Sequence, residues 1–121
     1  MSAIPAAGDV LDPEIPLLPL PEVATRLGLP PTRVQQQLRD HQLVALRRAK
    51  TLWIPEEFLD GDVVVKGLPG TVTLLYDSGY GPDEIMRWLF TPDESLPGTP
   101  IGALRGDRGR EVKRRAQALA F

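Results

Sequence analysis

Proline and glycine divide this chain into short segments, which limits the length of every regular element. The 121 residues include 13 prolines and 11 glycines. Proline suits the first turn of a helix, and glycine suits the residue just after its last turn. Because both residues disrupt the interior of a helix, a segment between them can form only a short helix or a strand. The sequence therefore predicts several short elements sharing one core.

Residues 1–20 differ from the rest of the chain in composition. They contain four prolines and three acidic residues, no basic residue, and no helical or strand periodicity. Such a segment is predicted to be an extended or disordered arm. Its last apolar residues could pack its end onto the domain; these are Ile15, Leu17, Leu18 and Leu20.

Two short helices are predicted next. The first runs from Pro21 to a stop at Gly28, and after the turn at Leu29 and Pro30 the second covers residues 31–39. Val34 and Leu38 lie four residues apart, so they share the inward face of the second helix. Its outward face carries polar residues at helical spacing, namely Thr32, Gln36 and Arg39, flanked by Arg33 and Gln35.

A β-hairpin is predicted after the two helices. Apolar runs at 43–46 and 52–55 flank a short linker at 47–51, although the linker lacks the Asn-Gly pair of a tight turn. The linker carries Arg47, Arg48, Lys50 and Thr51. Pro55 ends the second strand, residues 56–59 suit one helical turn, and 63–65 suit a short strand.

The second half of the chain has helical periodicity. Helices are predicted at about 68–78, 82–90 and 108–119, with a single turn at 101–104. We expect Trp53 and Trp88 in the core, and Val112, Ala116 and Leu119 on the inward face of the last helix. The predicted fold is mostly α with a small β-hairpin wing. It divides into an arm (1–20), a winged helix-turn-helix (21–66) and a C-terminal helical subdomain (67–121).

Several classes of function are excluded by residue content. The chain has no cysteine and only one histidine, His41, which we place at a helix end. Disulfides, thiolate metal sites and a zinc site are therefore not expected. The acidic, hydroxyl and glycine residues form no catalytic or phosphate-binding motif, so we expect neither an enzyme nor a cofactor. Because the apolar runs are too short to span a bilayer, we expect a cytoplasmic protein.

Basic residues are concentrated in two regions although the chain is acidic overall. The net charge is −2 and the pI is about 5.4. Residues 21–54 carry six basic residues against two acidic ones, and the last 21 residues have the same numbers. A local basic face attracts phosphate whatever the total charge. For the last helix, a solvated face and a second phosphate contact both remain open.

The order helix, turn, helix and basic hairpin is typical of a winged helix-turn-helix. Gln35 and Gln36 carry amides that suit adenine edges, and Arg33 and Arg39 can reach guanine or phosphate. The hairpin cations would neutralise phosphates. We therefore predict a protein that binds double-stranded DNA, either a transcriptional regulator or a DNA-associated accessory factor. The alternative is an interaction adaptor whose C-terminal helices bind a protein.

Residues 21–59 resemble the excisionase/MerR-type DNA-binding module. The shared features are Val23-Ala24, Leu27-Gly28, Val34, Leu38, Leu43, the basic hairpin and Trp53-Ile54-Pro55. Over residues 9–121, including IMRWLFTP at 85–92 and REVKRRAQALAF at 110–121, the chain resembles a family of small actinobacterial winged-helix DNA-binding proteins. One member of that family is a substrate of a mycobacterial Ser/Thr protein kinase.

That family resemblance implies sequence-nonspecific or poorly defined DNA binding, a monomeric winged-helix core with an added C-terminal helical piece, and a Ser/Thr kinase as a protein partner. We expect the protein to be nucleoid-associated. In the family the phosphorylated threonine lies in the N-terminal arm. Here the arm has no threonine and its hydroxyl residue is Ser2, so no phosphorylated position carries over. No long heptad helix follows the hairpin, unlike in dimeric MerR-type regulators, which also favours a monomer.

The C-terminal half also resembles the toxin-binding domain of certain helix-turn-helix antitoxins. The shared residues are Trp88-Leu89, Thr91-Pro92, Leu96, Gly98-Thr99-Pro100-Ile101 and Leu104. This resemblance supports the alternative of a protein-binding module, although such antitoxins usually carry a different DNA-binding domain.

Overall fold

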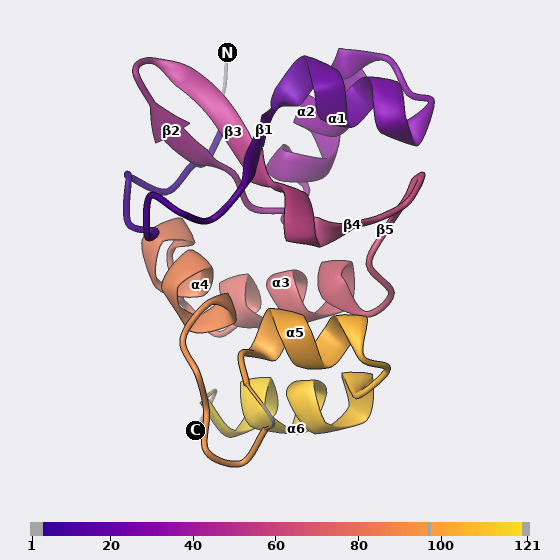
Figure 1. Cartoon of the computed structure of the whole chain (residues 1–121). Coiled ribbons are helices and arrows are strands. Elements are labelled where there is room, and N and C mark those ends of the chain that lie inside the picture. The colour runs from indigo at the N-terminus through magenta and orange to yellow at the C-terminus, as the bar shows by residue number, and fades with distance from the viewer. Residues whose placement is uncertain (1–3, 97, 120–121) are drawn as a thin grey trace.

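The protein consists of a small β-sheet and a helix pair above a layer of helices, as the computed structural model in Figure 1 shows. It describes residues 4–96 and 98–119. Within these residues six α-helices accompany one three-stranded sheet and one two-stranded sheet. The predicted fold class, mostly α with a β-hairpin wing, is confirmed.

The helix pair consists of α1 (Leu20–Leu27) and α2 (Pro31–Arg39). α2 has the predicted bounds, and α1 begins one residue earlier than predicted. Gly28 ends α1 with a φ of +67°, a left-handed conformation that glycine adopts at little cost. Val34 and Leu38 are fully buried, so the apolar stripe of α2 faces the core as predicted.

The wing is a three-stranded antiparallel sheet of β1 (Leu17–Pro19), β2 (Leu46–Arg48) and β3 (Thr51–Pro55), with β3 in the centre. β2 and β3 are joined at Ala49 and Lys50, whose φ angles are +52° and +67°. This is the backbone conformation of a tight hairpin turn, here made without glycine. The basic segment is therefore not all linker, since Arg47 and Arg48 lie in strand β2.

The prediction of a disordered N-terminal arm is wrong for residues 4–20, whereas the expected packing of its apolar end onto the domain is confirmed, since Leu18 is buried. β1 pairs with β3 in the register Leu18 to Ile54. Further upstream, the Ala7 N–H donates to the Ala45 carbonyl and the Arg47 N–H donates to the Ala7 carbonyl, each at 2.8 Å. The segment covers strand edges that would otherwise have unpaired backbone groups. Its prolines are tolerated because the segment lies at the edge of the sheet.

A short connection leads from the wing to the helical layer. β3 is followed by a 3₁₀ turn, η1 (Glu56–Phe58), and by the antiparallel pair β4 (Leu59–Asp60) and β5 (Val63–Val64). The turn at 56–59 and the short strand at 63–65 were both predicted. The predicted division at residues 66 and 67 falls between β5 and α3.

The lower layer contains α3 (Leu68–Asp77), α4 (Pro82–Leu89), α5 (Pro100–Arg105) and α6 (Gly109–Leu119). α3 packs against α4 and α6, and α5 packs against α4 and α6. These helices lie where helical periodicity predicted them, and α5 is longer than the single turn expected. Val112 and Ala116 are buried, but Leu119 is 37% exposed because it lies in the last turn of α6.

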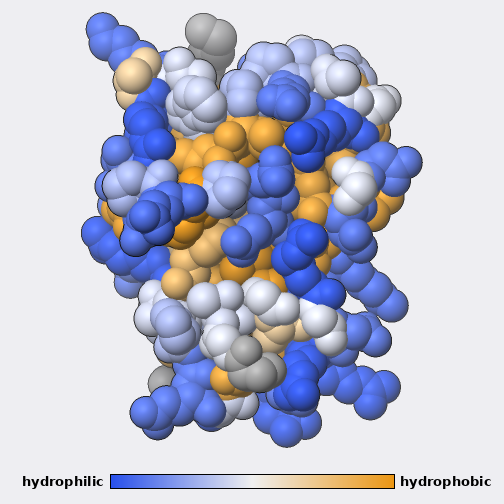
Figure 2. Space-filling model, in the orientation of Figure 1, coloured by the Kyte–Doolittle hydropathy of each residue, from blue (hydrophilic) through white to orange (hydrophobic). Residues whose placement is uncertain are grey.

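One apolar core runs through both layers. It includes Ile54 of the sheet and Val112 of α6. At the surface, apolar residues gather across the middle of the face visible in Figure 2, and hydrophilic ones surround them. The prediction that Trp53 and Trp88 lie in the core is wrong, since both are half-buried and pack against its edge. An indole N–H needs a partner, and that of Trp53 donates to the Arg48 carbonyl at 3.3 Å.

Phe58 ties the two layers together. Its side chain is fully buried, and its ring lies 5.9 Å from that of Phe90, which directly follows α4. Polar contacts also cross this boundary. Arg105 Nη1 donates to the Glu57 carbonyl at 2.9 Å, and the Gly8 N–H donates to Asp83 Oδ1 at 2.8 Å. The halves therefore share one core and should unfold together.

The end of α2 is also held against the helical layer. His41, two residues after α2, has a φ of +59°, and its ring stacks on Tyr76 with centroids 3.9 Å apart. Thr73 Oγ1 donates to the His41 carbonyl at 2.7 Å. The Tyr76 hydroxyl is buried with no hydrogen-bond partner among the described residues, and burial raises the pKa of this phenol.

We predict that Phe58→Ala lowers the free energy of unfolding by about 3–5 kcal/mol, because it leaves a cavity between the layers. Urea titrations measure this loss.

The same urea titrations test whether the two layers unfold together. Trp53 reports on the wing and Trp88 on the helical layer, so variants with one tryptophan each separate the two signals. In urea, fluorescence and far-UV circular dichroism should give the same midpoint within each variant. Distinct midpoints would show that the layers unfold separately. Val63→Ala, at a site 54% exposed, is the control and should change stability by less than about 0.5 kcal/mol.

We predict that Tyr76→Phe stabilises the fold by up to about 1 kcal/mol, because it removes an unpaired buried hydroxyl and keeps the ring. The pKa of Tyr76 is higher in the folded state than in the unfolded chain. Wild-type stability should therefore fall as the pH rises above about 10, and the variant should lose less. Urea titrations at neutral and alkaline pH measure both effects. Tyr80→Phe is the matched control and should not stabilise, since the Tyr80 hydroxyl donates to the Leu119 carbonyl at 2.7 Å.

Candidate nucleic-acid interface

Only some of the residues predicted on the outward face of α2 are exposed to solvent. Thr32, Arg33 and Gln36 are exposed, whereas Gln35 and Arg39 are half-buried. Three of the five residues are thus freely available to a ligand. The helix itself is held from behind by Val34 and Leu38, so its outward face is presented on a rigid support.

Gln36 is oriented by the residue that ends the helix. Its Nε2 donates to Asp40 Oδ1 at 2.9 Å, one helical turn away. A glutamine amide has two N–H donors and one carbonyl acceptor, so this bond leaves one donor and the acceptor free. The amide can therefore still make the paired donor and acceptor contacts that an adenine edge offers.

The wing cations fall into two groups. Arg47, Lys50 and Thr51 are exposed, and within residues 4–96 and 98–119 neither Arg47 nor Lys50 forms an ion pair. Arg48 is half-buried, and its Nη2 lies 2.6 Å from Asp9 Oδ1. That hydrogen bond raises the pKa of Arg48. Arg48 is therefore already neutralised, and it fastens the N-terminal segment to β2.

Sequence reasoning missed the role of Asp9. The acidic character of residues 1–20 was the available signal, but an arm treated as separate offered no reason to pair it with the wing. A similar neutralisation affects Arg26, whose Nη2 lies 3.6 Å from carboxylate oxygens of both Glu22 and Glu56. Of the six basic residues in 21–54, Arg33, Arg39, Arg47 and Lys50 form no ion pair among the described residues.

The available groups lie at one end of the molecule. In Figure 1 the tip of the wing and the α1–α2 pair both lie at the top, opposite α3 to α6. A polar helix face beside exposed cations on a hairpin suits binding to a double-stranded nucleic acid. The cations can contact its phosphates, and the helix can form hydrogen bonds with its base edges. Among the described residues no group of acidic or histidine side chains could hold a metal ion, and no helix is long and apolar enough to cross a membrane.

Comparisons with known proteins agree with this geometry. Residues 3–59 match the family model described as DNA-binding protein Rv2175c, wHTH domain, and residues 65–120 match the Rv2175c C-terminal domain of unknown function. The chain is 49% identical over 134 residues to DNA-binding protein Rv2175c of Mycobacterium tuberculosis, with 100% of this chain and 92% of the relative covered.

A solved structure is similar over the same length. The NMR structure of Rv2175c superimposes with a TM-score of 0.87 at 48% sequence identity, covering 98% of this chain and 91% of that one. The sequence match, the family models and the structure thus agree from the N-terminal segment to α6. The chain belongs to the Rv2175c family, which combines a winged helix-turn-helix domain with a C-terminal helical domain.

Proposed function

We propose that this chain binds double-stranded DNA, with α2 in the major groove and the wing on the adjacent phosphate backbone. The observation that carries the proposal is the exposed polar face of α2 at the same end of the molecule as the unpaired cations Arg47 and Lys50. The name of the Mycobacterium tuberculosis relative, a DNA-binding protein, supports it, and so does the family domain.

Different residues take different tasks in this proposal. Thr32 and Gln36 face base edges, because both are exposed and carry hydrogen-bonding groups. Arg33, Arg47 and Lys50 neutralise phosphates, and the Thr51 hydroxyl adds a backbone contact. Arg39 and Gln35 contribute less because they are half-buried. Arg48 acts indirectly, through Asp9, by holding the wing in place.

A further part of the proposal concerns the biological role and the oligomeric state. We propose a regulator or accessory factor that acts as a monomer on the nucleoid. Among the described residues the large hydrophobic side chains that are exposed are Val63 and Leu119, so few such side chains are fully available to a second copy. The same observation gives little support to the alternative of a protein-binding adaptor. A kinase partner stays a prediction from the resemblance, and Ser2 lies outside the described residues.

We predict that Arg47→Gln combined with Lys50→Gln weakens DNA binding tenfold or more, because two phosphate contacts are lost. Each lost contact should reduce the slope of log K against log salt by about 0.9. Fluorescence anisotropy with a mixed-sequence duplex between about 50 and 200 mM salt measures both quantities.

Arg87→Gln combined with Arg114→Gln removes the same charge from exposed sites in the helical layer, so it is the matched control and should keep the wild-type slope. Absence of wild-type binding to any duplex at the lowest salt would contradict the proposed function.

We predict that Thr32→Ala combined with Gln36→Ala reduces discrimination between DNA sequences, because base-edge contacts are lost while phosphate contacts remain. A good base contact contributes about 1–3 kcal/mol of discrimination. Selection from a random-sequence duplex pool, followed by competition titrations, measures the change. The salt slope should stay at the wild-type value. Gln117→Ala on α6 is the control, and an unchanged preference in the α2 variant would rule out base reading by these residues.

A further inference from the structure

A broad groove runs along α3 and the beginning of α6 in the helical layer. It has a volume of about 1200 Å³. Its walls come from the segment that enters α3, from one side of α3, and from the first turns of α6. No part of the DNA contact proposed above uses it.

The groove is lined by more free cations than free acids. Lys66, Arg110 and Lys113 line it, are exposed, and form no ion pair among the described residues. Two carboxylates, Asp77 and Asp107, also line it without a basic partner. The remaining charges cancel, since Arg108 Nη1 lies 3.4 Å from Glu111 Oε2.

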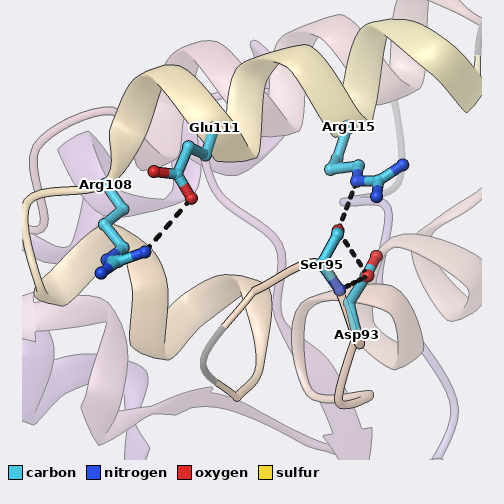
Figure 3. A network of polar contacts seen from close by, with 5 residues as sticks. All are labelled: Asp93, Ser95, Arg108, Glu111 and Arg115. Atoms are coloured by element: carbon cyan, nitrogen blue, oxygen red, sulfur yellow. Dashed lines mark hydrogen bonds and ion pairs between the residues drawn. The ribbon is translucent and has the colours of Figure 1, made fainter.

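The cations of α6 are divided between two faces of the helix. Figure 3 shows Arg115 directed at Ser95 of the loop after α4, where Ser95 also bonds Asp93, and it shows Arg108 directed at Glu111. The Arg115 contact joins α6 to the loop after α4, whereas the Arg108–Glu111 pair lies within the start of α6. Arg110 and Lys113 are three residues apart and therefore share a different face of the helix. They line the groove together with Arg108 and Glu111, but they form no ion pair among the described residues. They are free to meet a ligand.

The groove begins beside the C-terminal end of α2. Gln42, the third residue after α2, lines it. Thr73, another lining residue, donates to the carbonyl of His41 at 2.7 Å. In Figure 1 α3 and α6 both begin on the side of the helical layer that lies under the α1–α2 pair. The groove therefore extends from the C-terminal end of α2 into the helical layer.

We propose that this groove binds the phosphate backbone of the same DNA duplex whose major groove receives α2. Duplex DNA carries one negative charge per about 1.7 Å of helix axis, so the backbone that borders the major groove continues beyond the end of a reading helix. Lys66, Arg110 and Lys113 form a second cationic contact there, separate from the wing. This inference rests on the proposed function and assigns a role to the C-terminal half.

The test uses the full chain with Lys66→Gln, Arg110→Gln and Lys113→Gln combined. Fluorescence anisotropy with a mixed-sequence duplex of about three helical turns is measured between about 50 and 200 mM salt. We expect binding at the lowest salt to weaken tenfold or more, and the slope of log K against log salt to fall by about two to three. All three side chains are exposed, so the melting temperature should stay at the wild-type value.

A matched pair of single variants distinguishes the loss of a charge inside the groove from the loss of an equal charge outside it. Lys113 and Arg114 are adjacent and exposed on the same helix, but only Lys113 lines the groove. Lys113→Gln should reduce the salt slope by about one, and Arg114→Gln should leave it unchanged. Equal effects of the two variants would overturn the proposal, because the loss would then follow net charge rather than position.

The remaining outcomes distinguish this proposal from the function on which it rests. If the wild type binds DNA, the wing variant weakens it, and the groove variant does not, the groove proposal is overturned and the DNA-binding function stands. An acidic protein segment in the groove would give that same result. If the wild type binds no duplex, both proposals fail together.

Discussion

Strand β3 is hydrogen-bonded along both edges, and every functional part of the molecule depends on this arrangement. β2 on one edge carries Arg47 and continues into the wing turn. β1 on the other edge passes directly into α1. The end of β3 leads into η1, which places Phe58 in the core beside the helical layer. Because Ile54 is fully buried, a shift of one residue in this pairing would turn its side chain away from the core.

The charge pattern shows how an acidic chain can present basic surfaces. Among the described residues four carboxylates are paired with particular cations, as Asp9 is with Arg48 and Glu111 is with Arg108. Other cations are left exposed on the wing and along the groove. Charges separated by more than about 8–10 Å are largely screened at physiological salt, so local sums matter more than a net charge of −2. Binding confined to these two surfaces should accordingly depend steeply on salt.

Much of the helical fold could be predicted because its signals are local. The bounds of α2 follow from Pro31 and from the spacing of Val34 and Leu38. The candidate site was harder to predict. Its residue types could be listed from the sequence, but Arg48 was grouped with Arg47 because the two are neighbours in the chain. Alternation along β2 separates them, since Arg47 is exposed and Arg48 bonds Asp9, which lies 39 residues away.

By itself the sequence determined the short helices, the hairpin and the two basic regions, because helix starts, helix ends and apolar spacing act over a few residues. Only the tertiary structure decided that the N-terminal segment is part of the sheet, that Arg48 is neutralised, and that the start of α6 faces a groove continuous with the end of α2. Each of these depends on backbone pairing or packing between residues far apart in the chain. Such contacts cannot be predicted from the local periodicity of the sequence. The positions of proline and glycine determine where the helices and strands end, whereas burial of one shared core determines which of them pack together.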